Sequence, residues 1–336
     1  MEGRCGFLRL TEAIRRSVFF RRSRAVALVL FAGYFAAGGD LTEFDLENGV
    51  ILKMKEIPAG NFVMGSPFTE IGRTVDEIPH PVALGKFYLG IYEVTQEQYT
   101  AIMKKNPSMV KMPQLPVTMV TRADVLEFCR LLNRRTEGSR PSGFVFSLPT
   151  EAQWEYACRA GTTSSLNNGK ELSSRTRACS ALDEVAWNCY NVKQREPQPV
   201  GQKKPNAWGL YDMHGNVAEW CRDWLAEDLG TTYKIDPLGP NRDGAKPFSY
   251  YVYSNRYSYS GKFRTMRGGG WCGDNMSCRS GFRGGATTNN HNTDPRGNPY
   301  FYVTSYSGGS VSGGEVRYSP QNDWGFRVMC EAMVGE

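Results

Sequence analysis

The chain has 336 residues, 40% of them hydrophobic, so it can bury a sizeable core as one large domain or two ordinary ones. Its formal net charge of +6 is concentrated at the start, where residues 1–37 contain seven arginines and two glutamates, or +5, leaving +1 for the rest. A nearly neutral folded part excludes nucleic acid as a partner, because nucleic-acid-binding domains carry a basic patch or stripe.

Segment 1–37 is predicted to be a signal or targeting segment. Its arginines precede Ala25–Ala37, an apolar run too short to span a bilayer comfortably but suited to a signal-peptide core. Residues Phe31–Tyr34 look like a bacterial lipoprotein box, with Tyr34 in place of the lipid-bearing cysteine. We therefore expect an exported protein, at the cell surface or in the periplasm, with membrane contact only through this segment. A buried N-terminal helix is the alternative interpretation.

Residues 38–50 are interpreted as a linker, and residues 51–336 as a single domain. The sequence predicts short strands at Ile57–Ser66 and at Phe87–Val94. Three helices are expected after them, each beginning at a threonine that can cap its first turn: Thr95, Thr121 and Thr150. Gln98 and Gln153 stand three residues after the first and third of these threonines, which is the pattern of a capping box.

The chain contains nine cysteines, eight of them after the predicted signal segment. An exported chain with an even count can hold disulfides, but the spacings are long and irregular, and no pair is assigned. The sequence contains no paired Cys-x-x-Cys, the spacing that would predict a zinc site. Cys129 and Cys158 fall at apolar positions of predicted helices, where cysteine usually packs as a small hydrophobic residue.

The stretch Asn206–Trp224 is dense in aromatic residues and turn formers, which indicates a compact irregular core segment and not a long helix. Asp212 and Glu219 lie inside it. Buried carboxylates must be paired, hydrogen-bonded or bound to a metal, and carbonyls from the intervening turn could complete an oxygen cage for calcium. The alternative is that both carboxylates cap turns by accepting backbone N–H bonds.

This stretch resembles the hallmark of the formylglycine-generating enzyme (sulfatase-modifying factor) family, with Ala218 in place of a usual aromatic residue. Further phrases, such as Leu148–Thr162, extend the resemblance over roughly Ile57 to Val328. It implies an α+β protein with a C-type-lectin-like fold of the formylglycine-generating-enzyme type. It also implies a structural calcium, with the side chains of Asp212 and Glu219 and the carbonyls of Gly215 and Val217 as ligands.

In the active enzymes of this family, a cysteine pair binds copper, which activates oxygen to oxidise a cysteine of a protein substrate. Here the corresponding residues are Cys272 and Cys278, separated by five residues instead of the usual four, and Gly270 replaces the family's serine. Copper chemistry at these two cysteines is therefore kept as an alternative, beside a disulfide or two separate packing roles. His80, His214 and His291 are scattered, fall in no metal-spacing motif and are interpreted as structural or surface residues.

Residues 250–322 have a different composition. Nine of the seventeen tyrosines lie between Tyr250 and Tyr318, mixed with serine, glycine, asparagine and threonine. This composition is typical of an antibody-like contact surface. The long stretch before Trp324 is similar to the variable proteins of diversity-generating retroelements, some of which share this fold. The candidate ligand-binding residues are Tyr257, Tyr259, Trp271, Asp274, Asn275, Ser277, Asn289, Asn290, His291, Tyr300, Tyr302 and Tyr306.

The sequence as a whole predicts an exported, monomeric binding protein that presents residues 250–322 to a protein or other surface ligand. A copper-dependent formylglycine-generating oxidase is the alternative function. A third possibility is a structural surface protein whose long C-terminal insertion binds nothing specific.

Overall fold

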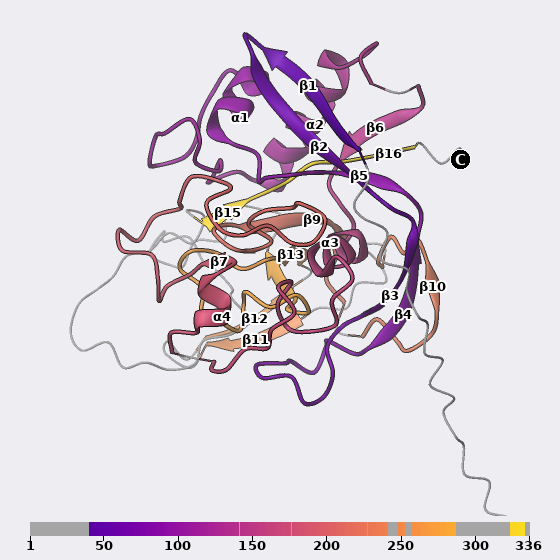
Figure 1. Cartoon of the computed structure of the whole chain (residues 1–336), viewed down its shortest axis with the longest axis vertical. Coiled ribbons are helices and arrows are strands. Elements are labelled where there is room, and N and C mark those ends of the chain that lie inside the picture. Colours follow the sequence, from indigo (N-terminus) through magenta and orange to yellow (C-terminus); the bar gives the residue numbers. More distant parts are fainter. Residues whose placement is uncertain are drawn as a thin grey trace, which may run out of the picture. The chain divides into compact units, whose positions relative to one another are not determined.

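The computed structural model describes residues 40–140, 142–175, 177–226, 228–240, 248–252, 257–261, 263–286 and 323–332 (Figure 1). All of them belong to one compact unit, Phe35–Glu336. For 248–252, 257–261 and Ala286 only the backbone is described. The predicted signal segment lies outside the described residues. None of the helices described is both long and apolar enough to cross a membrane.

The largest sheet has five strands and joins the two ends of the described chain. Its order is β1-β2-β5-β16-β6, so the last strand lies between two early ones. The strands are β1 (Leu41–Glu47), β2 (Val50–Ile57), β5 (Phe87–Gly90), β16 (Met329–Ala332) and β6 (Phe144–Ser147).

The prediction of a linker at 38–50 is wrong for most of that segment. Residues Leu41–Glu47 form strand β1, which pairs antiparallel with β2, and Phe44 and Leu46 are buried. Asn48 and Gly49 both have positive φ, 52° and 79°, as a tight hairpin turn between twisted strands requires.

Three capped helices cover the sheets. The helices are α1 (Gln96–Met103), α2 (Arg122–Arg135) and α3 (Glu151–Arg159), and a single turn, α4 (Ser180–Asp183), follows later. The two predicted capping boxes, at Thr95 and Thr150, are confirmed. Thr121 caps α2 as expected, and Asp124 completes a third box there. Helices α1 and α2 pack into one core with residues of the five-stranded sheet, such as Leu52. Phe326, which lies between β15 and β16, belongs to the same core.

Four smaller sheets complete the described part of the domain. A four-stranded sheet, β14-β13-β9-β15, lies at its centre, and α3 packs against β9 and β13. Its strands are β14 (Gly284–Ala286), β13 (Arg264–Arg267), β9 (Ala218–Trp224) and β15 (Trp324–Gly325). A three-stranded sheet consists of β10 (Lys234–Ile235), β4 (His80–Leu84) and β3 (Gly60–Met64). Two sheets have two strands each: β7 (Ala186–Trp187) pairs with β8 (His214–Gly215), and β11 (Phe248–Val252) pairs with β12 (Tyr257–Gly261).

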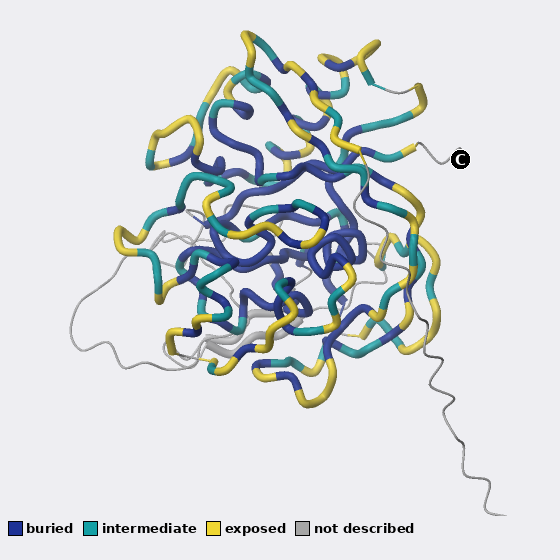
Figure 2. The backbone as a smooth tube through the Cα atoms, in the orientation of Figure 1, coloured by how far each residue is buried: buried dark blue, intermediate teal, exposed yellow. Residues whose placement is uncertain are grey.

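Burial follows this arrangement (Figure 2). The central sheet and α3 are almost wholly buried, whereas exposed residues gather in the connecting loops and along β3, β4 and β10. The eight cysteines from Cys129 to Cys330 are all free thiols, so no disulfide joins the described residues. Cys129 and Cys158 are buried in apolar clusters, as predicted.

Candidate functional site

The stretch Asn206–Trp224 runs through turns into the central strand β9. Asp212 and Asn216 both have positive φ, 55° and 60°, which places two sharp bends before the strand. Trp220 is fully buried against the helical core, and its Nε1 donates to the carbonyl of Val120. The predicted irregular segment therefore exists, but it ends at Ala218, where regular pairing begins.

Glu219 takes part in a buried ion pair. Its Oε1 lies 2.6 Å from Nη2 of Arg327, and its Oε2 lies 2.7 Å from Nε of the same arginine. Nε1 of Trp154 donates to Oε2 at 2.7 Å. Arg327 also donates to the carbonyls of Gly90 and Tyr211. The role of Glu219 that the structure shows is to hold β9 to the C-terminal segment. Ligation of calcium by Glu219 stays a prediction.

Asp212 has one carboxylate oxygen that is not satisfied. Its Oδ2 accepts from the N–H of Gly201 at 2.7 Å, whereas Oδ1 is buried and has no hydrogen-bond partner. Burial raises the pKa of Asp212 to about 6. A buried unpaired oxygen is costly unless something outside the protein completes it.

Glu93 is an acidic residue of this site that sequence reasoning missed. It is fully buried; its Oε1 accepts from the N–H of Val217 at 2.9 Å, and its Oε2 accepts from Nδ2 of Asn216 at 2.6 Å. Burial raises its pKa well above the usual range, and Asp212 adds to the effect. The available signal was the same as for Asp212: a carboxylate inside an apolar phrase, between Tyr92 and Val94.

Calcium fits this neighbourhood in part. The carboxylates of Asp212 and Glu219 raise the pKa of Glu93, the carboxylate of Glu219 raises that of Asp212, and the buried guanidinium of Arg327 lowers both. The free Oδ1 of Asp212 is the type of ligand that calcium takes, together with backbone carbonyls. In the described part of the chain, no three or more His, Cys, Asp or Glu side chains form a metal-binding group. A calcium here would therefore depend largely on carbonyl oxygens.

The two cysteines of the copper alternative have separate surroundings. The thiol of Cys272 lies 2.7 Å from Oδ2 of Asp323, to which it donates. Cys278 is fully buried in an apolar cluster with leucines such as Leu166 and Leu172. Burial raises the pKa of both thiols, and the Asp323 carboxylate raises that of Cys272 further. Because copper(I) is held by thiolates, binding it here would have to release the protons of both thiols and break the hydrogen bond from Cys272 to Asp323.

Asp323 occupies the space beside the glycine that replaces the family's serine. A Cβ added to Gly270 would lie 2.5 Å from Oδ2 of Asp323 and 2.8 Å from its Cβ. The cavity left at this point has a volume of about 30 Å³. That is roughly the volume that one water molecule takes in the liquid. The lining residues include Gly269, Gly270, Gly273, Ser277, Asp323 and Trp324.

Three predicted ligand-binding residues are wrong as surface contacts. Trp271, Asn275 and Ser277 are all buried. Both groups of the Asn275 amide are used inside the protein: Nδ2 donates to the carbonyls of Ser174 and Arg177, and Oδ1 accepts from Asn188. Oγ of Ser277 donates to the carbonyl of Asp274 at 2.8 Å. These residues fix the shape of the cysteine-bearing loop.

The other predicted contacts are placed only in part. Asp274 is half-buried. Tyr257 and Tyr259 belong to β12, where they pair with Val252 and Tyr250 of β11, and only their backbone is described. The remaining candidates, Asn289, Asn290, His291, Tyr300, Tyr302 and Tyr306, lie outside the described residues.

Three buried arginines, which the sequence did not single out, hold segment Arg267–Arg283 in place. Each is paired with glutamate from another element: Arg267 with Glu155, Arg279 with Glu70 and Glu77, and Arg283 with Glu151. Arg279 lies 2.6 Å from each of its two partners, and Arg283 lies 2.7 Å from Glu151. Removing one partner of such a pair leaves an unpaired buried charge, so this segment is held in one conformation.

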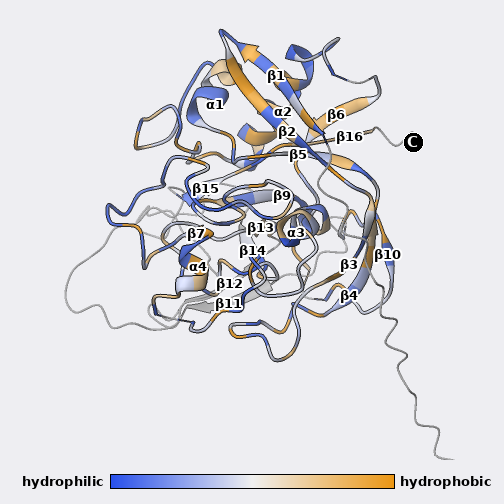
Figure 3. Ribbon diagram, in the orientation of Figure 1, coloured by the Kyte–Doolittle hydropathy of each residue, from blue (hydrophilic) through white to orange (hydrophobic). Residues whose placement is uncertain are grey.

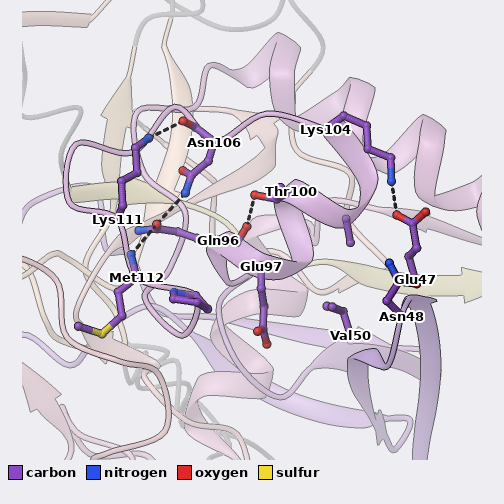
Figure 4. Close-up of a pocket in the computed structure, with 12 residues that line it drawn as sticks. Glu47, Asn48, Val50, Gln96, Glu97, Thr100, Lys104, Asn106, Lys111 and Met112 are labelled. Atoms are coloured by element: carbon purple, nitrogen blue, oxygen red, sulfur yellow. Dashed lines mark hydrogen bonds and ion pairs between the residues drawn. The ribbon is translucent and has the colours of Figure 1, made fainter.

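A second cavity, of about 540 Å³, lies between α1 and the turn joining β1 to β2 (Figure 4). Its polar side chains bond largely to one another. Lys104 pairs with Glu47, and Gln96 Oε1 accepts from Nδ2 of Asn106 at 2.8 Å. Nζ of Lys111 donates to the carbonyl of Asn106 at 2.5 Å. No candidate residue from the sequence lies in this cavity.

The fold and site define an α+β domain in which one buried segment, Arg267–Arg283, is clamped onto a central strand by ion pairs. A family model described as the sulfatase-modifying factor enzyme 1-like domain matches residues 47–295, and the chain belongs to that family. The predicted C-type-lectin-like fold of the formylglycine-generating-enzyme type is thereby confirmed.

Relatives of this chain have diverse names. The chaperone protein LppX of Paenibacillus barcinonensis is 32% identical over an alignment of 228 residues that covers 54% of this chain and 76% of LppX. The formylglycine-generating enzyme of Thermomonospora curvata is 26% identical over 280 residues, covering 81% of this chain and 83% of that enzyme. Among solved structures, Treponema denticola variable protein 1 is 25% identical with a TM-score of 0.62, covering 86% of this chain and 98% of that protein.

Proposed function

We propose that this protein is an exported, non-catalytic member of its family that binds a protein or other surface ligand through residues 250–322. The observation that carries the proposal is the surroundings of the family's cysteine pair. The thiol of Cys272 donates to Asp323, and Cys278 is fully buried in an apolar cluster. An oxidase of this family would need both cysteines as reactive thiolates, and these surroundings favour the protonated thiols instead.

The scaffold beneath the proposed surface suits binding. Strand β13 precedes the arginine-clamped segment, and β14 follows it, so the chain enters and leaves residues 287–322 from a rigid base. Binding residues are commonly carried by loops on a rigid scaffold. The similarity to Treponema denticola variable protein 1, which extends over 98% of that protein, supports the same proposal, because its name describes a protein that varies in sequence.

A structural calcium at Asp212, with carbonyls of Gly215 and Val217, belongs to the proposal. It would complete the free Oδ1 of Asp212 and offset the surplus of buried carboxylates beside Arg327. Its contribution would be stability of the turn before β9.

The alternative, a copper-dependent oxidase, is tested by titrating the purified full chain with copper(I). Three variants accompany it: Cys272→Ser, Cys278→Ser and Asp323→Ala. We expect no tight one-to-one binding by the full chain. Tight binding that both serine variants abolish would refute the non-catalytic proposal. Binding that appears only in Asp323→Ala would show that this carboxylate is what blocks the site.

Ligand binding is tested by selecting from a displayed random-peptide library on the full chain. The matched control is a variant with residues 287–322 replaced by a short Gly/Ser linker, checked for an unchanged thermal melt. We expect enriched peptides that bind the full chain and lose at least tenfold affinity for the variant. Equal binding to both proteins would exclude residues 287–322 as the part of the proposed surface that recognises the ligand.

A further inference from the structure

Several arginines lie on one face of the central strand β9. Figure 3 colours much of this strand as hydrophilic, although it belongs to the central sheet. Arg222 and Trp224 stand two residues apart on β9 and are both half-buried, so they share one face of the strand. Arg264 of β13 pairs with Trp224, and its Cζ lies 3.7 Å from the centre of the indole ring. That distance is typical of a cation held over an aromatic ring.

Two of the arginines converge on one backbone oxygen. Nη1 of Arg264 donates to the carbonyl of Arg222 at 2.7 Å, and Nη2 of Arg122 donates to the same carbonyl at 3.5 Å. Arg122 is the first residue of α2, so a helix and a strand that are far apart in the sequence bring their guanidinium groups together here. We call Arg122, Arg222 and Arg264 the arginine cluster.

Both converging guanidinium groups keep donors that no described protein group accepts. Nε of Arg122 and Nε of Arg264 are buried without a hydrogen-bond partner. One terminal nitrogen of each group, Nη1 of Arg122 and Nη2 of Arg264, likewise makes no hydrogen bond to the described residues and is not buried. Both side chains are half-buried as a whole. A ligand from solvent can therefore reach at least one free donor on each arginine.

The positive charge of the cluster is neutralised only in part. Arg222 forms an ion pair with Glu331 at 3.2 Å, whereas Arg122 and Arg264 form none with any residue that the structure describes. The buried arginines of the clamped segment, by contrast, are each paired with glutamate.

Asp223 does not supply the missing negative charge. It follows Arg222 on β9 and so points to the opposite face, where it accepts from the N–H of Glu151 at 2.8 Å. Burial raises the pKa of Asp223 to about 8, which leaves it mostly protonated at neutral pH. Burial and the charge of Arg122 lower the pKa of Arg264 to about 10, and Asp223 opposes them less strongly. Arg264 is therefore still charged at neutral pH.

The position of Arg122 adds to the positive potential. It lies in the first turn of a helix of 14 residues, where the helix dipole disfavours a further cation. Asp124 in the same turn is already bonded to Thr121 and to Lys105. Two like charges are thus held together without a protein counter-charge in the described structure, and an anion between them would relieve the repulsion.

We propose that Arg122 and Arg264 bind a doubly charged oxyanion of the phosphate monoester type. A guanidinium presents its N–H donors in a planar fork that matches phosphate oxygens. A phosphate monoester carries about 1.5 to 2 negative charges at neutral pH, so one group neutralises both arginines, whereas a carboxylate would neutralise one. The ring of Trp224 and the carbonyl of Arg222 hold Arg264 in place before the anion binds. The inference does not rest on the proposed function, because no candidate ligand-binding residue belongs to the arginine cluster.

The test is isothermal titration calorimetry of the full chain with glycerol 3-phosphate, at constant ionic strength and in a buffer without other oxyanions. We expect saturable one-to-one binding. Arg122→Gln and Arg264→Gln should each raise the dissociation constant at least tenfold, because each removes charge-assisted hydrogen bonds. Arg134→Gln is the matched control, since it removes the same charge from the exposed far end of α2. It should change the dissociation constant less than twofold.

Two further measurements separate binding from an effect on folding. Thermal melts without the anion show whether each variant is folded, and glycerol 3-phosphate should raise the melting temperature of the full chain but not of Arg264→Gln. Arg264→Lys keeps the charge and loses the planar fork, so it should also weaken binding. Arg122 makes one long hydrogen bond, at 3.5 Å, so Arg122→Gln leaves the fold with little to lose.

Three results would overturn the proposal. They are the absence of saturable binding, binding that Arg122→Gln and Arg264→Gln leave unchanged, and acetate binding as tightly as glycerol 3-phosphate. A flotation assay with phosphatidylcholine vesicles, with and without phosphatidic acid, distinguishes two sources of the phosphate group. Flotation that requires both phosphatidic acid and the two arginines would identify a lipid headgroup. Arginine-dependent binding of glycerol 3-phosphate without flotation would identify a soluble phosphate.

Discussion

Substitution of Gly270 by alanine tests whether Asp323 fills the space of the family's catalytic segment. The backbone of Gly270 has no positive φ, so the cost of a side chain here is steric. The new Cβ would lie 2.5 Å from Oδ2 of Asp323 and 2.8 Å from its Cβ. The carboxylate could rotate away, but the Cβ cannot move without the backbone. Overpacking of this kind costs about 1–3 kcal/mol, and we expect that loss in urea unfolding at pH 7.

The size of the loss should depend on residue 323. In an Asp323→Ala background the 2.8 Å contact remains, so Gly270→Ala should lose only part of its cost. In an Asp323→Gly background both contacts are gone, and the cost should fall below about 0.5 kcal/mol. Gly269→Ala is the control, because Gly269 has φ +70° and its Cβ would lie 2.7 Å from the Ser277 carbonyl oxygen. Its cost should be equal in all three backgrounds. An unchanged cost of Gly270→Ala across the series would refute the steric argument.

Three further predictions follow from the buried charges. Burial raises the pKa of Asp223 from 3.8 to about 8, so its stabilising effect is complete below pH 4 and is lost as the pH rises through 8. Asp223→Asn should therefore stabilise the protein by up to about 4 kcal/mol at pH 7 and little at pH 4, as urea midpoints will show; a pH-independent difference would contradict this. Arg327→Ala should cost about 3–5 kcal/mol by leaving Glu219 unpaired, whereas Lys105→Ala on the surface should cost less than about 1; similar losses would exclude the buried pair. Calcium at millimolar concentration should raise the melting temperature by several degrees. Asp212→Asn should abolish this rise, and magnesium should not reproduce it. A melting temperature indifferent to calcium would exclude the site.

Local signals predicted the local structure well. The threonine and glutamine of each predicted capping box are three residues apart, so their hydrogen bonds form within one turn and do not depend on the rest of the fold. Strand β1 was missed although Asn48-Gly49 is a strong hairpin signal, because the polar, acidic alternation around Phe44 reads as a linker until its partner strand is known.

The site was harder to predict because its residues are joined across long separations. Arg327 and Glu219 are 108 residues apart, and nothing near either one identifies the other. Composition likewise cannot separate a contact surface from an internal network. Asn275 and Ser277 belong to the residue types that binding loops favour, yet their polar groups are satisfied inside the protein.

In the proposed function, the contacts around Cys272 also provide a firm base for the proposed ligand-binding surface. Asp323 immediately follows the stretch 287–322 and bonds back to Cys272, while Arg283 anchors the chain shortly before that stretch begins. Both ends of the intervening chain are therefore tied to buried ion pairs or hydrogen bonds, and substitutions between them need not disturb the core. Under the proposed function those residues could vary between relatives, since the described core is held by buried ion pairs of Arg267, Arg279 and Arg327.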